Sequence, residues 1–568
     1  MASRRLITSV LLFVSIFVFT LSVSAAWVDN GVRITDGEEA ELEPRITTDG
    51  AGGAYIAWEQ GFTSALLKNS IFIQRIDGNG NILWMTGNII LNEDSTIAWS
   101  PVDLAPDGSG GVLVCWTDGR GGVTNSRDVY AQRLDSSGNK LWGMYGAEVY
   151  VGPNEQDYPL IVSDGAGGAV IVWRDDSGAG DRDLHAQRLN ASGVRLWSHS
   201  GIPVCTDPSD QNRHQAVSDG DGGIIVTWDD NRSASSDIYA QRVDSDGIVQ
   251  WALDGIPICV NMDQQTFPRI ASDDAYGAII TWQESTVNLY AQRVDAAGDT
   301  LWAANGIVVC TNPYGARSDP QIARDGSGGA VLCWYDSRTP RGIYGQRIDA
   351  TGDTLWSGPG VPVCLAIATQ EEPRIASDGS GGAAIVWKES LRQQYDYGDV
   401  YARTVDPGGI VQGPSTGVPI CTAGGLQRFI HITTDGSGGG IITWSDYRNS
   451  AETGSDIYAG RVYFNGTTDA DTPDLPQAGF LSQNYPNPFN PSTTIEFGLD
   501  KTSPVSLNVY DVAGRLVRII LDETLPAAHY AEVWDGKDGS GNAVASGVYF
   551  YRLETDTITR TRKMVLLR

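Results

Sequence analysis

The chain has 568 residues, with 67 glycines, 17 tryptophans and a charged fraction of only 19%. This length exceeds one ordinary hydrophobic core, and the composition predicts many short strands joined by tight turns, which excludes an all-helical architecture. The formal net charge of −29 at pH 7 argues against nucleic acid as a partner.

The N-terminus has the pattern of a secretory signal peptide over residues 1–26. Arg4 and Arg5 precede an apolar run from Leu6 to Val23, and small residues follow as far as Ala26. The alternative is an uncleaved membrane anchor, because the apolar run is long for a signal. We expect cleavage near Ala26, so the mature protein is predicted to be secreted, in the extracellular space or on the outer cell surface.

An internal repeat dominates residues 27–466. A segment of the type Pro-x-Ile-x-x-Asp-Gly-x-Gly-Gly, followed by an apolar run that ends in Trp, recurs at intervals of roughly 55 residues, which is comparable to the period of propeller repeats. The eight terminal tryptophans are Trp58, Trp116, Trp173, Trp228, Trp282, Trp334, Trp387 and Trp444.

Each repeat is predicted to form four antiparallel strands. The Asp-Gly-x-Gly-Gly segment supplies a tight turn between the first two strands. The second strand is apolar on both faces, as expected for sheets that are covered on both sides. The turn Asp recurs in all copies, as Asp49, Asp107, Asp164, Asp219, Asp273, Asp325, Asp378 and Asp435.

The two ends of the repeat region share one copy. The eighth copy lacks a fourth strand after Arg461, whereas Trp27–Ile34 matches the pattern of that strand. An N-terminal strand that completes the last sheet would close a ring and remove its edges. We therefore predict an all-β fold in which a monomeric, eight-bladed β-propeller is closed by its N-terminal strand.

Seven cysteines are an odd number, which argues against a complete disulfide framework. Five of them fall at one position of the repeat, and equivalent positions in neighbouring blades are too far apart for bridging. We expect these residues to be free and buried. They are Cys205, Cys259, Cys310, Cys364 and Cys421.

A linker over residues 467–478 and a small β-domain over residues 479–568 follow the repeats. Alternating apolar residues between Thr494 and Leu567 fit a β-sandwich. The acidic linker residues Asp469, Asp471 and Asp474 do not have the spacing of a calcium loop, and the turn Asp residues supply too few oxygen ligands. We therefore expect no cofactor, and calcium binding has only weak support.

The C-terminal domain resembles a known family through several motifs that occur in order. These are Asn484-Tyr-Pro-Asn-Pro-Phe-Asn-Pro-Ser-Thr-Thr-Ile495, Val509-Tyr-Asp-Val-Ala-Gly-Arg515, Trp534-Asp-Gly-Lys-Asp-Gly-Ser-Gly541, Ala545-Ser-Gly-Val-Tyr-Phe-Tyr-Arg552 and Lys563-Met-Val-Leu-Leu-Arg568. They look like the C-terminal sorting domain of the type IX secretion system, whose Ig-like sandwich is similar to the Ig-like domain of the flagellar hook-capping protein. The resemblance implies that this domain engages the secretion machinery.

No Ser, His and Asp order and no metal-spaced His pair stands out among the five histidines. Seven repeats have an acidic residue two positions after the strand Trp, such as Asp118 and Asp336. We interpret these residues as ion-pair partners of the third-strand arginines, Arg133, Arg188, Arg242, Arg293 and Arg347.

The loops between the second and third strands vary among the repeats, and variable loops on a rigid scaffold commonly carry recognition. Aromatic and Arg residues are the preferred anchors of binding sites. The predicted ligand-binding residues are Tyr314, Arg338, Arg341, Tyr395, Tyr397, Tyr447 and Arg448.

The sequence thus favours a secreted or cell-surface binding or adhesion protein, with a propeller head for an extracellular glycan or protein and a C-terminal sorting domain. Two alternatives stay open. One is an extracellular carbohydrate-active hydrolase or lyase, and the other is a structural component of a surface coat.

Overall fold

The computed structural model describes most of the chain. The described residues are 27–35, 39–61, 69–84, 88–92, 98–120, 127–176, 182–285, 287–311, 317–365, 368–390, 398–450, 454–464, 480–481, 484, 489–498, 503–525, 529–556 and 559–567. The predicted signal peptide and linker lie outside them. All regular elements of the described residues are β-strands, and no helix among them could cross a membrane.

Eight sheets make up the N-terminal part of the described chain. Sheet 1 contains β2 (Ala40–Thr48), β3 (Ala54–Gly61), β4 (Asn69–Ile76) and β5 (Ile89–Ile90). Sheet 2 contains β6 (Ala98–Pro106), β7 (Val112–Asp118), β8 (Asp128–Leu134) and β9 (Ala147–Tyr150). Sheet 3 contains β10 (Gln156–Ser163), β11 (Ala169–Asp176), β12 (Arg182–Leu189) and β13 (Ile202–Cys205). Sheet 4 contains β14 (Gln211–Ser218), β15 (Ile224–Asp230), β16 (Asp237–Val243) and β17 (Ile256–Cys259).

The second half of this region repeats the pattern. Sheet 5 contains β18 (Gln265–Ser272), β19 (Ala278–Glu284), β20 (Asn288–Val294) and β21 (Ile307–Thr311). Sheet 6 contains β22 (Arg317–Arg324), β23 (Ala330–Asp336), β24 (Gly342–Ile348) and β25 (Val361–Cys364). Sheet 7 contains β26 (Thr369–Ser377), β27 (Ala383–Ser390), β28 (Asp399–Val405), β29 (Val411–Gln412) and β30 (Val418–Cys421). Sheet 8 contains β31 (Gln427–Thr434), β32 (Gly439–Asp446), β33 (Asp456–Tyr463) and the N-terminal β1 (Val32–Arg33).

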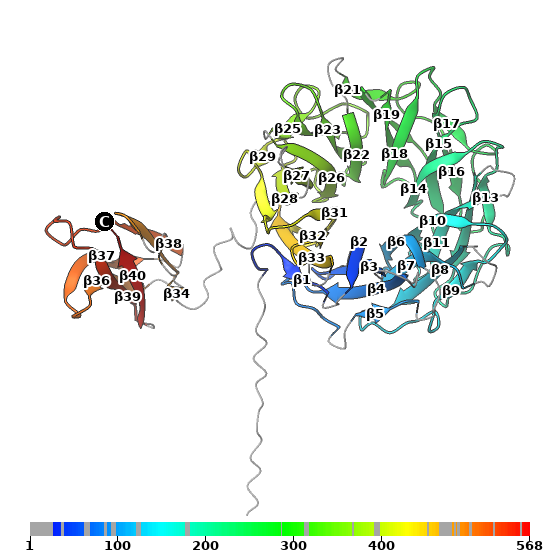
Figure 1. Cartoon of the computed structure of the whole chain (residues 1–568). Coiled ribbons are helices and arrows are strands. Elements are labelled where there is room, and N and C mark those ends of the chain that lie inside the picture. The colour runs from blue at the N-terminus through cyan, green and yellow to red at the C-terminus, as the bar shows by residue number, and fades with distance from the viewer. Residues whose placement is uncertain are drawn as a thin grey trace, which may run out of the picture.

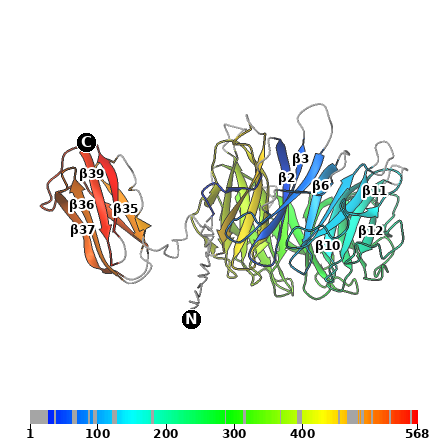
Figure 2. The ribbon, with the colours of Figure 1, turned by 90° about the horizontal axis from the view of Figure 1, so that it is seen from below.

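The sheets stand side by side in a propeller-like ring (Figure 1). The first strand of each sheet lies nearest the centre, and we call these eight the inner strands. Each inner strand contacts the inner strands of both neighbouring sheets, and β31 contacts β2, so that the contacts form a closed cycle. Seen from the edge, the strands run between two faces of the ring (Figure 2).

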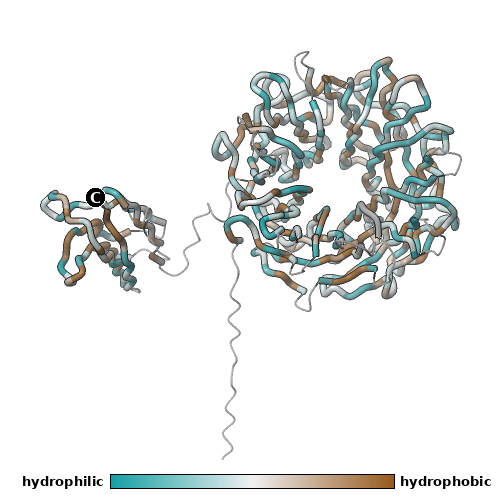
Figure 3. Tube along the Cα trace, viewed as in Figure 1, coloured by the Kyte–Doolittle hydropathy of each residue, from teal (hydrophilic) through white to brown (hydrophobic). Residues whose placement is uncertain are grey.

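The second strand of each sheet forms the core of the ring. Every residue of β7, β15 and β19 is buried, because each sheet is covered by a neighbour on both faces. Apolar residues accordingly recur in each sheet around the ring (Figure 3). The eight repeat tryptophans are among the largest fully buried side chains. All seven cysteines are buried and free, including the five at the repeated position for which this was predicted.

The N-terminal segment completes sheet 8, as the sequence predicts. Val32 and Arg33 pair antiparallel with Ala459 and Tyr458 of β33. Gly31 has a φ of +82°, and a Cβ atom there would lie 2.4 Å from the ring of Trp444. Glycines that precede the fourth strands of other sheets, such as Gly146 and Gly201, meet the repeat Trp of their own sheet in the same way. Gly31 therefore fills the repeated glycine position in sheet 8.

One face of the ring, which we call the turn face, is built from repeated polar contacts. In sheet 4, Asp219 accepts hydrogen bonds from the N–H groups of Asp221 and Gly223, at 2.9 and 2.7 Å, and forms an ion pair with Arg242 at 2.9 Å. Arg242 also donates to the carbonyl of Ala296 in sheet 5, at 3.1 Å. Each such Asp and Arg thus fix a turn and join it to the next sheet.

These contacts correct one prediction. Seven sheets pair their turn Asp with the third-strand Arg, at N–O distances of 2.5–2.9 Å. The acidic residue after the Trp is therefore not the partner of that Arg. The reason is the antiparallel register, since Arg133 lies opposite Leu113, near the turn, whereas Asp118 lies opposite Asp128 at the other end of β7. Thr404 replaces the Arg in sheet 7.

The C-terminal part contains two further sheets around one apolar core. The first contains β34 (Phe480–Leu481), β35 (Thr493–Gly498) and β38 (His529–Trp534). The second contains β37 (Leu516–Leu525), β36 (Ser503–Asp511), β39 (Gly547–Glu554) and β40 (Thr559–Leu566). Their shared core includes Phe497, Leu507, Trp534, Tyr551 and Met564.

Candidate ligand-binding site

The inner strands carry β-bulges near their first residues, at the face opposite the turn face. We call this the loop face. The register shifts at the bulge, and seven inner strands place one non-Gly residue there in the left-handed region, with φ between 50° and 56°. We call these the bulge residues, and they are Glu43, Tyr158, Arg213, Phe267, Asp319, Glu372 and Phe429. Sheet 2 has a longer bulge that contains Pro101.

The bulge residues have two properties of a functional site. A left-handed non-Gly residue costs about 1–2 kcal/mol, and such strain tends to persist at binding and catalytic sites. Bulges also redirect side chains near such sites. The bulge residues include acids, aromatic rings and one Arg, whereas the turn face repeats the same residue types. The chemical variation of the ring is therefore concentrated at the centre of its loop face.

A cavity of ≈ 860 Å³ opens beside three of the bulge residues, Glu43, Tyr158 and Arg213. Its lining comes from five successive sheets, which only the inner side of a ring can bring together. The lining residues are Glu43, Arg45, Pro101, Tyr158, Leu160, Arg174, Asn212, Arg213, His214, Gln215, Asp229, Asn231, Ser236, Gln264 and Thr266. We call it the mouth cavity.

Tyr158 presents an aromatic ring at the edge of the mouth cavity. Tyr158 is 50% exposed. The guanidinium carbon of Arg174 lies 4.7 Å from the centroid of the Tyr158 ring. Arg174 is held in turn by Asp157, at 2.7 Å, and it donates to the amide oxygen of Asn212, at 3.2 Å. The Tyr158 ring is therefore fixed from one side by an ion-paired cation and is half open to solvent.

Sheets 4 and 5 repeat this arrangement with different residues. The guanidinium carbon of Arg213 lies 4.5 Å from the Phe267 ring centroid, and Arg213 forms an ion pair with Asp229 at 2.8 Å. Burial raises the pKa of Asp229, although the Arg213 hydrogen bond opposes that shift. His214 donates from Nε2 to the carbonyl oxygen of Tyr158, at 2.9 Å, and burial lowers its pKa to about 4. The lining of the mouth cavity therefore includes one aromatic ring that is backed by a cation, Tyr158, and a second such ring, Phe267, lies against the lining residue Arg213.

Two of the predicted ligand residues are held inside the sheets. Arg338 is 8% exposed, donates from Nε to Asp336 at 2.7 Å, and covers the ring of Tyr344 at 4.1 Å. Arg448 donates to Asp446 and to the carbonyl of Asn30, at 2.6 and 2.8 Å. The same clamp occurs in sheets 2 and 4, at Arg120 and Arg232. These arginines thus join strands of their own sheet rather than extend into a loop.

Two further predicted ligand residues, Arg341 and Tyr447, are not among the described residues that line the mouth cavity. Arg341 and Tyr447 are half-buried at the loop face. Tyr314, Tyr395 and Tyr397 lie outside the described residues. Three residues that line the mouth cavity lie at the end of β15 or in the loop that follows it, namely Asp229, Asn231 and Ser236.

The sequence reasoning missed the bulge residues. In five repeats the bulge residue directly precedes a proline, as in Tyr158-Pro159 and Phe267-Pro268. A residue before proline prefers extended conformations, so the sequence pattern points away from a left-handed bulge. The usable signal was the variation itself, because the residue before this repeated proline differs from copy to copy.

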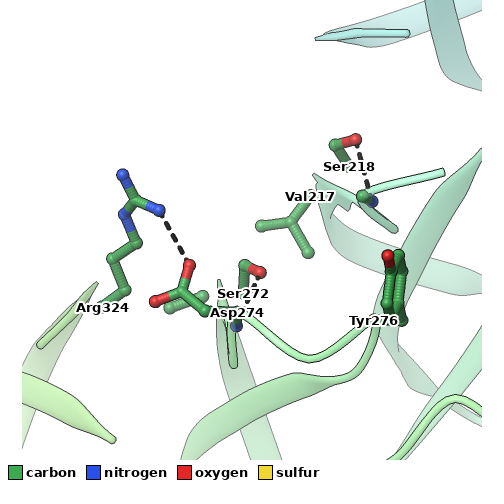
Figure 4. Close-up of a pocket in the computed structure, with 8 residues that line it drawn as sticks. Val217, Ser218, Ser272, Asp274, Tyr276 and Arg324 are labelled. Atoms are coloured by element: carbon green, nitrogen blue, oxygen red, sulfur yellow. Dashed lines mark hydrogen bonds and ion pairs between the residues drawn. The ribbon is translucent and has the colours of Figure 1, made fainter. Parts of the chain in front are cut away.

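A second pocket, of ≈ 580 Å³, opens on the turn face between sheets 4, 5 and 6 (Figure 4). Sheet 5 has Asp274 and Tyr276 where the other seven turns have glycines, and both residues have positive φ, at 58° and 68°. Asp274 forms an ion pair with Arg324 at 2.8 Å, and Tyr276 is 55% exposed. Figure 4 shows Arg324 and Tyr276 on opposite sides of the pocket. This turn differs from the other turns in both its chemistry and its backbone strain.

No group of three or more His, Cys, Asp or Glu side chains in the described part of the chain could hold a metal ion.

The C-terminal domain matches a known family. Residues 487–557 match the FlgD Ig-like domain. No curated protein is similar in sequence to the chain.

The solved structures that the chain matches share little sequence with it. A puromycin hydrolase is 15% identical with a TM-score of 0.41, over 70% of this chain and 58% of its own length. A lectin from Burkholderia pseudomallei is 12% identical with a TM-score of 0.42, over 64% and 96%. PorZ, a surface component of the type IX secretion system of Porphyromonas gingivalis, is 12% identical with a TM-score of 0.31, over 93% and 82%. The chain thus spans less than two thirds of the puromycin hydrolase.

Proposed function

We propose that this protein is a secreted or cell-surface recognition protein that binds an extracellular glycan at the mouth cavity of an eight-bladed β-propeller. The observation that carries the proposal is the set of bulge residues, since it gathers different side chains at one mouth of an otherwise repetitive ring. Exposed aromatic rings beside charged and amide groups suit a ligand with apolar ring faces and many hydroxyls.

The rigidity of the mouth cavity supports binding. Tyr158 and Phe267 are each fixed by an ion-paired Arg, so little side-chain freedom is lost when a ligand packs on them. Asn212, Gln215 and Thr266 add polar groups that can pair with hydroxyls. An extracellular protein with a polar loop would use the same groups, and it is the second class of ligand to test.

A binding experiment on the mature chain tests this proposal. A glycan array identifies ligands, and isothermal titration calorimetry measures their affinity for Tyr158→Ala and Phe267→Ala. Truncation of an aromatic anchor is expected to weaken binding by tenfold or more. Tyr145→Ala is the matched control, because Tyr145 is an exposed aromatic residue, at 43%, in the loop between β8 and β9, outside the mouth cavity, whereas Tyr158 lines that cavity and Phe267 lies against its Arg213. Equal binding by all four proteins would contradict a glycan site at the mouth cavity.

An enzymatic role is the second candidate, and Asp103 is the observation that favours it. Burial raises the pKa of this inner-strand carboxyl to about 6, a value at which it could exchange a proton near neutral pH. An extracellular carbohydrate-active hydrolase or lyase would then lose its activity in Asp103→Asn. Glycan release by the wild type and not by this variant would favour catalysis over binding alone.

For the C-terminal domain we propose the role of a sorting domain for a type IX secretion system. The order of its sequence motifs and its match to the FlgD Ig-like domain support this proposal. Deletion of residues 479–568, followed by cell fractionation, should retain the protein inside the cell. Unchanged delivery to the surface or the medium would contradict it.

A further inference from the structure

One position recurs on every inner strand, opposite the residue before the repeat Trp. Arg45 lies opposite Ala57, Arg269 opposite Thr281 and Arg374 opposite Val386. Because the inner strands form a closed cycle, equivalent positions lie at one level around the ring centre. We call these eight residues the central tier, and they are Arg45, Asp103, Leu160, Gln215, Arg269, Gln321, Arg374 and His431.

The central tier gathers positive charge in a protein with a net charge of −29. Burial and the charge of Arg45 lower the pKa of Arg374, and burial and Arg374 lower the pKa of Arg269 to about 10. Burial, Arg45 and Arg374 together hold the pKa of His431 well below its usual range. The cations therefore lie close enough to oppose one another's charge.

These arginines find few partners among the described residues. Arg45 Nη1 donates to His431 Nε2 at 2.5 Å, which fits a neutral imidazole. Arg269 and Arg374 each donate from Nη1 to the carbonyl of the preceding proline on their own strand, at 3.1 and 2.9 Å. No carboxylate of the described chain lies within ion-pair distance of any of the three guanidinium groups.

The nearby carboxylates are engaged elsewhere or lie farther away. Asp103 accepts a hydrogen bond from the N–H of Ile161 in sheet 3, at 2.9 Å. Glu372 pairs with Lys388 at 3.1 Å. Asp319 attracts Arg269 and Arg374 electrostatically at longer range, without forming an ion pair with either. Asp319 is exposed at the loop face. Carboxylates thus act on the three guanidinium groups only at longer range, without a direct ion pair among the described residues.

We propose that the centre of the ring binds an oxyanion, a sulfate or a phosphate group, between the guanidinium groups of Arg45, Arg269 and Arg374. Planar guanidinium groups donate paired hydrogen bonds to tetrahedral oxyanions. Cations that repel one another and have no direct ion-pair partner destabilise a fold, and a bound anion offsets that cost. The oxyanion is either a free ion or a sulfate group on a glycan. This site does not depend on glycan binding at the mouth cavity.

Thermal unfolding of the mature chain in sodium sulfate, compared with sodium chloride of equal ionic strength, tests the proposal. Sulfate should raise the Tm of the wild type by roughly 3 °C or more at saturation. Arg374→Gln and Arg269→Gln should unfold at a higher temperature than the wild type in chloride, because a repelling charge is gone, and should lose the response to sulfate. Arg428→Gln is the matched control, since Arg428 is an exposed Arg on the inner strand β31, and it should keep the wild-type response.

The same titration with dextran sulfate and with neutral dextran separates the two sources of the anion. Saturation by inorganic sulfate alone indicates a free ion, and a response that only dextran sulfate produces indicates a sulfated glycan. The proposal is overturned if neither sulfate form shifts the Tm of the wild type. It is also overturned if Arg374→Gln lowers the Tm in chloride and keeps the sulfate response, because the arginines would then be structural.

Discussion

The two faces of the ring use the same repeat in opposite ways. On the turn face, seven sheets repeat one ion pair between a turn Asp and a third-strand Arg, and each Arg reaches the next sheet. On the loop face, seven sheets repeat one strained bulge but fill it with different side chains. The comparison teaches that repeated contacts give the turn face a uniform set of links between sheets, whereas a repeated backbone bulge with varied side chains gives the loop face its chemical variety.

Removal of a turn Asp should produce the largest loss of stability. Asp219→Ala leaves the guanidinium group of Arg242 without its ion-pair partner. It also leaves the N–H groups of Asp221 and Gly223 without their acceptor. Loss of one partner of a buried ion pair costs about 3–5 kcal/mol. Urea unfolding measures this change. Asp221→Ala, at an exposed position in the same turn, should cost no more than about 0.5 kcal/mol. Equal effects of the two variants would contradict a structural role for the turn face.

Closure of the ring can be tested at Gly31. Gly31→Ala places a Cβ 2.4 Å from Trp444 and in a left-handed conformation, and it should cost about 2–4 kcal/mol. Gly50→Ala has the same backbone strain, with a φ of +71°, but no atom within 4 Å of its Cβ. It should cost only about 1–2 kcal/mol. Similar melting temperatures for the two variants would show that the N-terminal segment does not pack in sheet 8.

The raised pKa of Asp103 predicts a pH dependence of stability. Because burial raises its pKa from 3.8 to about 6 in the folded protein, the folded state binds more protons than the unfolded state between these values. Its contribution to the free energy of unfolding is therefore present at about pH 4 and is lost as the pH rises to about 6. Asp103→Asn should remove this fall in a comparison of urea unfolding at the two pH values. Asp246→Asn, an exposed control, should leave the fall unchanged.

The smallest effect on stability is expected at the bulge residues of the loop face. Tyr158→Gly removes a strained left-handed side chain together with its contact to Arg174. These changes oppose each other, so the free energy of unfolding should change by no more than about 1 kcal/mol. Ligand binding should nevertheless be lost, which calorimetry measures. A large loss of stability would show that Tyr158 belongs to the scaffold.

The sequence predicted the all-β architecture, the repeat unit and the N-terminal strand, because each depends on local patterns. The buried Trp residues, the turn glycines and the alternation of apolar residues act within a few positions of one another. The partner of Arg133 was predicted wrongly, because the choice between Asp107 and Asp118 depends on register across two strands. The candidate site was missed for a similar reason, since the bulge residues are brought together only by closure of the ring.

The pairing of β1 with β33 sets the order in which the molecule can be completed. Arg33 and Asp456 form an ion pair at 2.7 Å although 423 positions separate them. A chain that emerges from its N-terminus can form individual sheets early, but sheet 8 keeps an open edge until nearly all of the ring has emerged. Native closure is therefore a late folding event of high contact order.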